Sequence, residues 1–128
     1  MARYLLDTHA AIWFFNGDDR LSKTAKEVIL DTFNQIHLSI ASVWEVAIKT
    51  SLGKLSFGGG ASGFIRLAED NGFTLLPIEA VHIIALENLP YHHRDPFDRI
   101  LIAASLSERM SFISSDRNMV KYGISLTW

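Results

Sequence analysis

Hydrophobic residues follow two different spacings along the chain. Short apolar runs have the length of buried strands and lie at residues 3–6, 37–40, 73–76 and 112–114. Between these runs, apolar residues recur at the spacing of one helix face, in residues 8–15, 22–33, 42–49, 79–89 and 97–109. Strands that alternate with helices in this way favour a three-layer α/β/α fold, with a central parallel sheet covered by helices on both faces.

The other loops and elements suggested by the sequence belong to the same domain. Glycines at residues 58–60 mark a flexible loop, and the apolar positions from Phe64 onward suggest another helix after it. The last apolar pair, Ile124 and Leu126, indicates an edge strand, so we expect about four to five strands in the sheet. We therefore predict a single domain that spans residues 1–128.

Composition narrows the function classes. The 128 residues are 48% hydrophobic, which is enough to fill one core, and 12 Lys and Arg against 14 Asp and Glu leave the chain nearly neutral. Any polyanion must therefore be held by local basic residues. The absence of cysteine excludes thiol nucleophiles, disulfides and thiolate zinc sites, and it fits the cytoplasm. Because Asp7 and His9 interrupt the N-terminal apolar stretch, we expect neither a signal peptide nor a membrane span.

Four acidic residues stand where the predicted elements begin or end. They are Asp7, Glu45, Asp98 and Asp116. In a parallel sheet, strand C-termini and helix N-termini share one edge, so these carboxylates are expected to converge there. A cluster of carboxylate oxygens is the donor set that a hard divalent cation such as Mg²⁺ prefers.

Each acid also has a purely structural explanation. Asp7 could cap the helix that starts at Thr8, and Ser42 with Glu45 has the spacing of a capping box. Asp95 could cap a helix that begins at Pro96, which would leave Asp98 in its first turn. Asp116 could likewise cap a turn through Arg117 and Asn118. Spacing alone leaves both explanations open.

Four segments, in this order, resemble the PIN-domain family, specifically the VapC-like toxins of type II toxin–antitoxin systems. They are LLDTHAAIWFF, SVWEVAIK, HHRDPFDRILIAA and FISSDRNMVKYGI, and the resemblance covers nearly the whole chain. It implies a PIN-like fold and a metal-dependent endoribonuclease that hydrolyses RNA phosphodiester bonds with Mg²⁺ or Mn²⁺. It maps the catalytic and metal-binding acids onto Asp7, Glu45, Asp98 and Asp116, with Asp95 as a candidate fifth acid.

The resemblance also implies roles and partners. Asp7 and Asp98 would bind the metal directly, Asp116 would complete its coordination, and Glu45 would orient the attacking water or a second ion. Attack by water would leave a 5′-phosphate and a 3′-hydroxyl. Members of the family form homodimers and are silenced by a cognate antitoxin protein.

Several basic residues are candidates for contacts with RNA phosphates. Arg94, Arg99 and Arg117 flank the acids, and Lys49, Lys54 and the His92–His93 pair are further candidates. The aromatic run 13–15 predicts either a docking surface or a deeply packed first helix.

Two alternatives remain at this level. One is a PIN-like module that binds RNA or protein without turnover, and the other is a housekeeping PIN nuclease without an antitoxin. The intact acids argue against the first.

Overall fold

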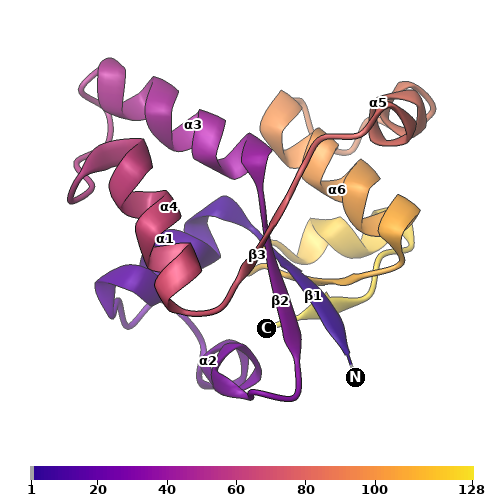
Figure 1. Ribbon diagram of the computed structural model, residues 1–128. Coiled ribbons are helices and arrows are strands. Elements are labelled where there is room, and N and C mark those ends of the chain that lie inside the picture. Colours follow the sequence, from indigo (N-terminus) through magenta and orange to yellow (C-terminus); the bar gives the residue numbers. More distant parts are fainter. Residues whose placement is uncertain (1) are drawn as a thin grey trace.

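The central sheet has five strands, all parallel, in the order β3-β2-β1-β4-β5. The computed structural model describes residues 2–128 (Figure 1). The strands are β1 (Arg3–Leu6), β2 (Gln35–Ser39), β3 (Thr74–Leu76), β4 (Ser111–Ile113) and β5 (Leu126–Thr127). The predicted parallel sheet between helical layers is confirmed, and the edge strand expected near the C-terminus is β5.

Six α-helices and one short 3-10 helix connect and cover these strands. They are α1 (Thr8–Asn16), α2 (Lys23–Leu30), α3 (Ile40–Ser51), α4 (Gly60–Asp70), α5 (Ala80–Glu87), α6 (Pro96–Glu108) and the 3-10 helix η1 (Arg117–Tyr122). The sequence pattern predicted all six α-helices, five of them to within a few residues at each end; for α4 it gave only the apolar positions from Phe64 onward. It missed η1, which is too short to show a helical period.

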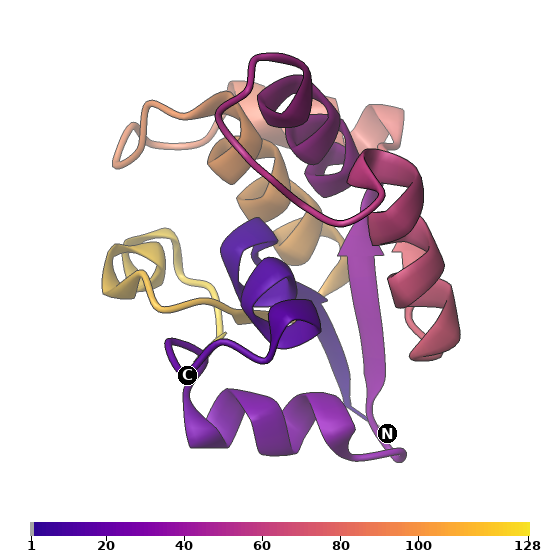
Figure 2. The ribbon, with the colours of Figure 1, turned by 90° about the vertical axis from the view of Figure 1, so that its left-hand side faces the viewer.

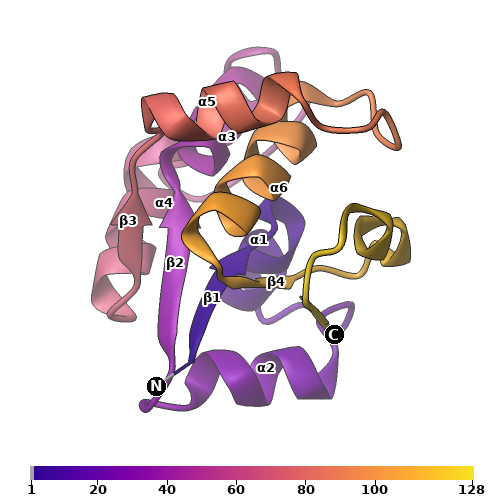
Figure 3. The same ribbon diagram turned by 90° about the vertical axis from the view of Figure 1, so that its right-hand side faces the viewer.

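Alternation along the strands divides the core into two clusters, one on each face of the sheet. Leu6 and Ile113 face α1, α2 and α4, whereas their neighbours Leu5 and Phe112 face α6 and η1. Figure 2 shows α1 in front of the first face, and Figure 3 shows α6 across the second, with α5 beside it. Both faces of the sheet are therefore buried, as a parallel sheet requires.

The aromatic run on α1 belongs to the first core. Trp13, Phe14 and Phe15 all pack against that cluster, and the Phe15 ring lies 5.4 Å from the Phe64 ring in an edge-on arrangement. The three side chains are only partly buried, so the run is packed against this core without being deeply buried, and Trp13 also lines a groove.

Helix α3 begins earlier than its sequence pattern predicts. Ser39 is its cap, because the Ser39 hydroxyl accepts a hydrogen bond from the Ala41 amide at 3.0 Å, and Ser42 already lies inside the helix. The capping box predicted for Ser42 and Glu45 is therefore wrong. Glu45 lies in the second turn, and its carboxylate is free of any role at the helix start.

Helix α2 is shorter than its pattern predicts. The helix ends at Leu30, with Asp31 as its C-cap, so Phe33 lies outside it and is 80% exposed. No helix within residues 2–128 combines the length and the apolar character needed to cross a lipid bilayer.

Candidate metal centre

Asp7 lies at the carboxyl edge of the sheet, immediately after β1. Its backbone N–H donates to the Ile113 carbonyl at 2.9 Å, and its side chain is only 7% exposed. Asp7 occupies the N-cap position of α1, as the capping explanation predicts, but its carboxylate makes no cap hydrogen bond to the helix. Instead, the buried Ser114 hydroxyl donates to Asp7 Oδ2 at 2.8 Å and fixes the direction of the carboxylate.

Glu45 reaches the same edge from α3. It is 4% exposed, and its Oε2 accepts a hydrogen bond from Lys49 Nζ at 2.6 Å, one helical turn further on. This contact raises the pKa of Lys49, chiefly through the hydrogen bond itself. A buried carboxylate without such a cation would be costly, so Lys49 is the internal counter-ion of Glu45.

Asp98 comes from the first turn of α6, where Asp95 caps the helix. Asp95 Oδ1 accepts from the Phe97 amide at 2.8 Å, as the sequence predicted, and its side chain is exposed. Burial, together with the negative charges of Asp7, Asp95 and Glu45, raises the pKa of Asp98 to about 7. These carboxylates therefore lie close enough to repel one another.

The pKa of Asp7 is raised as well. Burial is the main cause, and the charge of Glu45 adds to it, whereas the hydrogen bond from Ser114 and the proximity of His9 oppose it. Asp7, Glu45 and Asp98 thus form one electrostatically coupled group that three separate elements bring together.

Asp116 joins this group through His93. Asp116 Oδ1 accepts from the Asn118 amide at 3.0 Å, so the predicted turn cap is confirmed. Its other oxygen lies 2.6 Å from His93 Nε2, and His93 Nδ1 lies 3.0 Å from the Tyr122 hydroxyl. The proximity of His93 also lowers the pKa of Asp98, against the larger effects that raise it.

The sequence matches the PIN domain model over residues 4–124. This chain belongs to the PIN-domain family. No curated protein matches it.

Solved structures share the PIN fold with this chain at low sequence identity. A chain of the Rickettsia felis VapBC2 complex, bound to a DNA fragment from its promoter, matches with a TM-score of 0.71 and 10% identity, over 97% of this chain and 96% of that one. DNA-bound VapBC from Salmonella typhimurium matches with a TM-score of 0.67 and 14% identity, over 98% and 97%. Mycobacterium tuberculosis VapC20, described as a Sarcin-Ricin loop cleaving toxin, matches with a TM-score of 0.66 and 17% identity, over 94% and 95%.

The donor chemistry of this PIN domain fits a hard divalent cation. Within residues 2–128, no three acidic or histidine side chains stand at metal-ligand spacing. Asp7 is nevertheless buried and Asp98 partly buried, and the charge of Asp7 raises the pKa of Asp98, a repulsion that a dication would relieve. Their hard, anionic oxygens are the ligands that Mg²⁺ and Mn²⁺ favour. In the present arrangement, Lys49 and His93 contact the other two carboxylates.

Arg99 corrects one prediction about the RNA-contacting residues. Its side chain is buried, with 4% exposed, and its guanidinium donates to the backbone carbonyls of Pro90, Leu86 and Leu89. It also lies 3.9 Å from the centre of the Tyr91 ring. Arg99 therefore holds the loop between α5 and α6 and is not available to a phosphate, whereas Arg94 and Arg117 are exposed.

Sequence reasoning missed several residues that shape this edge. Ser114, rather than the neighbouring Ser115, contacts Asp7, because Ser114 is the buried one of the two. The Thr8 and Ser42 hydroxyls lie 2.8 Å apart and link α1 to α3. Only the contact between Glu45 and Lys49 had a readable signal, since an acid four residues before a lysine favours pairing on a helix.

Proposed function

We propose that this PIN-domain protein is a metal-dependent endoribonuclease and the toxin of a type II toxin–antitoxin pair. The observation that carries the proposal is the electrostatically coupled group of Asp7, Glu45 and Asp98 at the carboxyl edge of a parallel sheet, in which Asp7 and Glu45 are buried and Asp98 is partly buried. Ligand sites of open α/β folds lie at this edge. PIN domains are generally nucleases, and the similar VapC20 is described as a toxin that cleaves the Sarcin-Ricin loop.

The roles of the acids follow from where their side chains are held. Asp7, fixed by Ser114, and Asp98, at the start of α6, would be the direct metal ligands. Asp116, oriented by His93, would complete the coordination. When bound, Mg²⁺ or Mn²⁺ supplies a Lewis acid that stabilises the charge developing on the phosphodiester.

Glu45 would orient the attacking water. Its second oxygen is left free when Oε2 accepts the hydrogen bond from Lys49. Because water attacks in place of the ribose 2′-hydroxyl, the products should carry a 5′-phosphate and a 3′-hydroxyl. Of the three arginines predicted to contact substrate phosphates, Arg94 and Arg117 are exposed and could do so, whereas Arg99 is buried.

The direct experiment is cleavage of a mixed-sequence RNA by the purified protein with Mg²⁺ or Mn²⁺. Asp7→Asn and Asp98→Asn should each lower the rate by at least about 100-fold, since each removes a metal ligand, and EDTA should abolish cleavage. Asp70→Asn, an exposed acid on α4, is the matched control and should cut normally. Cyclic 2′,3′-phosphate ends would contradict attack by water, and a folded protein that neither binds metal nor cuts RNA would favour the binding-module alternative.

An antitoxin partner is the second part of the proposal. The similar structures from Rickettsia felis and Salmonella typhimurium are VapBC complexes. A small upstream gene that encodes a DNA-binding start and a disordered tail should yield a protein that co-purifies with this chain and stops its cleavage of RNA. A nuclease that retains full activity in the presence of that product would favour the housekeeping alternative.

A homodimer is the third part, and the structure offers one apolar face for it. An apolar groove of about 250 Å³ lies between α3, α5 and α6, with Trp44, Ile83 and Phe97 among its walls. Trp44 and Ile83 are more than half exposed, as are the nearby Val81 and Ile84, which is unusual for a surface in contact with water. Since Trp44 and Phe97 adjoin Glu45 and Asp98, a second copy seated here would also brace two acid-bearing helices.

Gel filtration with light scattering tests this face. Ile83→Asp with Ile84→Asp should convert a dimer to a monomer at micromolar protein. Leu30→Asp, equally exposed on α2, should leave the dimer intact. A dimer that survives the paired substitution, or a wild-type monomer, would contradict the assignment.

A further inference from the structure

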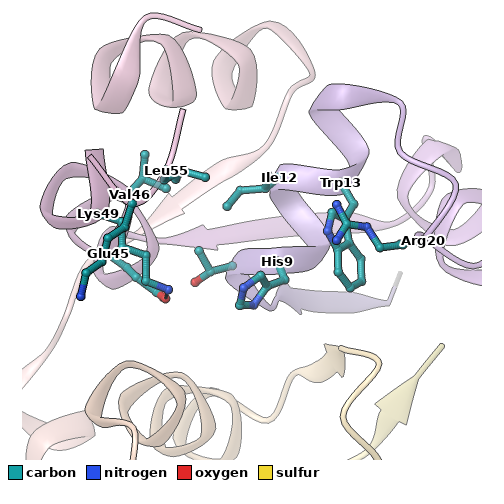
Figure 4. A pocket seen from close by; sticks show the side chains of 10 residues that line it. His9, Ile12, Trp13, Arg20, Glu45, Val46, Lys49 and Leu55 are labelled. Carbon is teal, nitrogen blue, oxygen red and sulfur yellow. Dashed lines mark hydrogen bonds and ion pairs between the residues drawn. The ribbon is translucent and has the colours of Figure 1, made fainter. Parts of the chain in front are cut away.

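A groove beside the group of Asp7, Glu45 and Asp98 is lined by aromatic, basic and apolar side chains. It lies between α1 and α3, has a volume of about 320 Å³, and includes Thr8 and Glu45 in its wall. Figure 4 shows side chains from the two helices facing each other across it. The groove is therefore continuous with the proposed cleavage site, and its volume suits one small planar group better than a double helix.

The α1 wall of the groove is a layered aromatic and cationic surface. His9 is exposed one turn before Trp13, with the two ring centroids 6.0 Å apart. The Arg20 guanidinium lies 5.1 Å from the centre of the Trp13 ring. Asp18 holds Arg20 in this position through hydrogen bonds of 2.7 to 3.2 Å. The wall is thus set before any ligand arrives.

The opposite wall, on the α3 side, combines apolar, cationic and acidic side chains. Val46 and Leu55 face Ile12 of α1, and Lys49 lies on the same side of the groove. Lys54, whose amide donates to the Lys49 carbonyl, also lines it. Three cations line this groove, but Arg20 is paired with Asp18 and Lys49 with Glu45, so Lys54 is the one placed to meet a phosphate. This combination matches a polyanion that carries planar rings, because bases stack on aromatic and guanidinium planes while phosphates meet the cations.

We propose that this groove binds the unstacked nucleobase of a nucleotide next to the scissile phosphate. The base would stack against the layer formed by His9, Trp13 and Arg20, and its phosphate would meet Lys54. The inference rests on the proposed ribonuclease function and narrows the substrate to single-stranded or looped RNA, because a paired base cannot enter the slot. It also makes the groove the source of any preference for the nucleotide beside the cut.

The test measures RNA binding without turnover, in the Asp98→Asn protein. The probe is a fluorescently labelled oligouridylate of about ten nucleotides, in which one abasic position is moved along the chain. At one position along the probe, the abasic site should weaken binding about 10-fold, because the stacking of one base is lost. His9→Ala combined with Arg20→Ala should weaken binding of the intact probe by a similar factor and remove the effect of that abasic position.

Controls keep the result interpretable. Arg66→Ala removes an exposed charge from α4 and should bind the probe as the parent does. His9 and Arg20 are both exposed, so the paired variant should fold, and circular dichroism checks this. Trp13→Leu is a second variant that keeps apolar packing and should also lose the abasic effect.

The outcomes separate this inference from the proposed function. Wild-type protein that cleaves RNA while no abasic position matters, or while the groove variants bind normally, would overturn the base-binding groove alone. Groove variants that lose the antitoxin tail but bind RNA unchanged would overturn it in favour of a peptide site. Absence of both RNA cleavage and RNA binding in every variant would defeat the proposed function, and this inference with it.

Discussion

Individual side chains at the acidic edge are held in positions that cost free energy of folding. Asp98 is partly buried among Asp7, Asp95 and Glu45, and this environment raises its pKa to about 7. A carboxyl group in this environment favours the protonated form, so its ionisation opposes folding. Electrostatic repulsion of this kind is expected at a site that binds a cation.

Asp98→Asn should stabilise the apo protein while abolishing cleavage. The folded pKa lies above the unfolded value of 3.8, so the stability that Asp98 contributes is full below pH 4 and is lost as the pH rises to about 7. The asparagine cannot ionise, and at pH 8 in EDTA it should raise the free energy of unfolding by about 1 to 2 kcal/mol, an amount reduced by solvent screening. Urea unfolding at pH 4 and pH 8 measures this; equal differences at both pH values would contradict it.

His37 makes the opposite contribution at the middle of the sheet. It is buried on β2, and within residues 2–128 neither ring nitrogen has a hydrogen-bond partner. Burial lowers its pKa below the usual value of 6.5, and the charge of Arg3 adds to this. The unfolded chain therefore binds the proton more readily, so the stability that His37 contributes is full above pH 6.5 and is lost as the pH falls through its folded pKa.

His37→Leu should therefore flatten the stability profile on the acidic side. Between pH 7.5 and pH 5, thermal unfolding of the wild type should lose more stability than that of the variant. The exposed His92, changed to Gln, provides the control and should keep the wild-type slope. Parallel profiles for His37→Leu and the wild type would contradict this, because they would show that His37 does not contribute to the loss of stability at low pH.

At the scale of elements, the loop between α5 and α6 is tied down by one arginine. The Arg99 guanidinium donates to the carbonyls of Leu86, Leu89 and Pro90, which end α5 and begin the loop. The loop leads directly to Asp95 and Asp98, and it carries His93 to Asp116. The arginine thus sets the position of two predicted site acids without touching them.

Arg99→Lys should destabilise the fold although it keeps the charge. An ammonium group cannot reach three carbonyls in one plane, and the loss of hydrogen bonds from a charged donor costs about 2 to 3 kcal/mol. Arg94→Lys, on the exposed part of the same loop, should change stability by less than about 0.5 kcal/mol. Chemical denaturation compares the two; similar midpoints would mean that the carbonyls are as well satisfied by water.

For the whole molecule, the proposed metal links the separate elements. Asp7 follows β1, Glu45 lies on α3, Asp98 begins α6 and Asp116 follows β4. A cation bound by side chains from several elements stabilises only the folded arrangement, because the unfolded chain does not bring them together. Metal binding should therefore raise the free energy of unfolding of the whole domain.

Saturating Mg²⁺ or Mn²⁺ should raise the midpoint of thermal unfolding. At a concentration of about 100 times Kd, the gain is about 2.7 kcal/mol, or about 8 to 10 °C for a chain of this size. Asp98→Asn should lose most of the rise, and Asp70→Asn should keep it. A rise that is unchanged in Asp98→Asn would place the metal elsewhere on the molecule.

Much of the fold and part of the candidate site could be predicted from the sequence by itself. Apolar periodicity determined the alternation of strands and helices, and hence the parallel sheet, because both elements are specified by contacts that repeat over a few residues. In such a sheet Asp7 and Asp98 must lie at the same edge. Both the parallel sheet and the shared edge of these two acids follow from local sequence patterns.

The partners of each side chain were decided by tertiary structure alone. Ser114 contacts Asp7 across 107 positions of sequence, and His93 contacts Asp116 across 23. The burial of Arg99 and the groove between α1 and α3 depend in the same way on how whole elements pack. Contacts between distant residues leave no periodic trace in a single sequence, so the sequence determined which carboxylates share an edge, and packing decided what holds each of them.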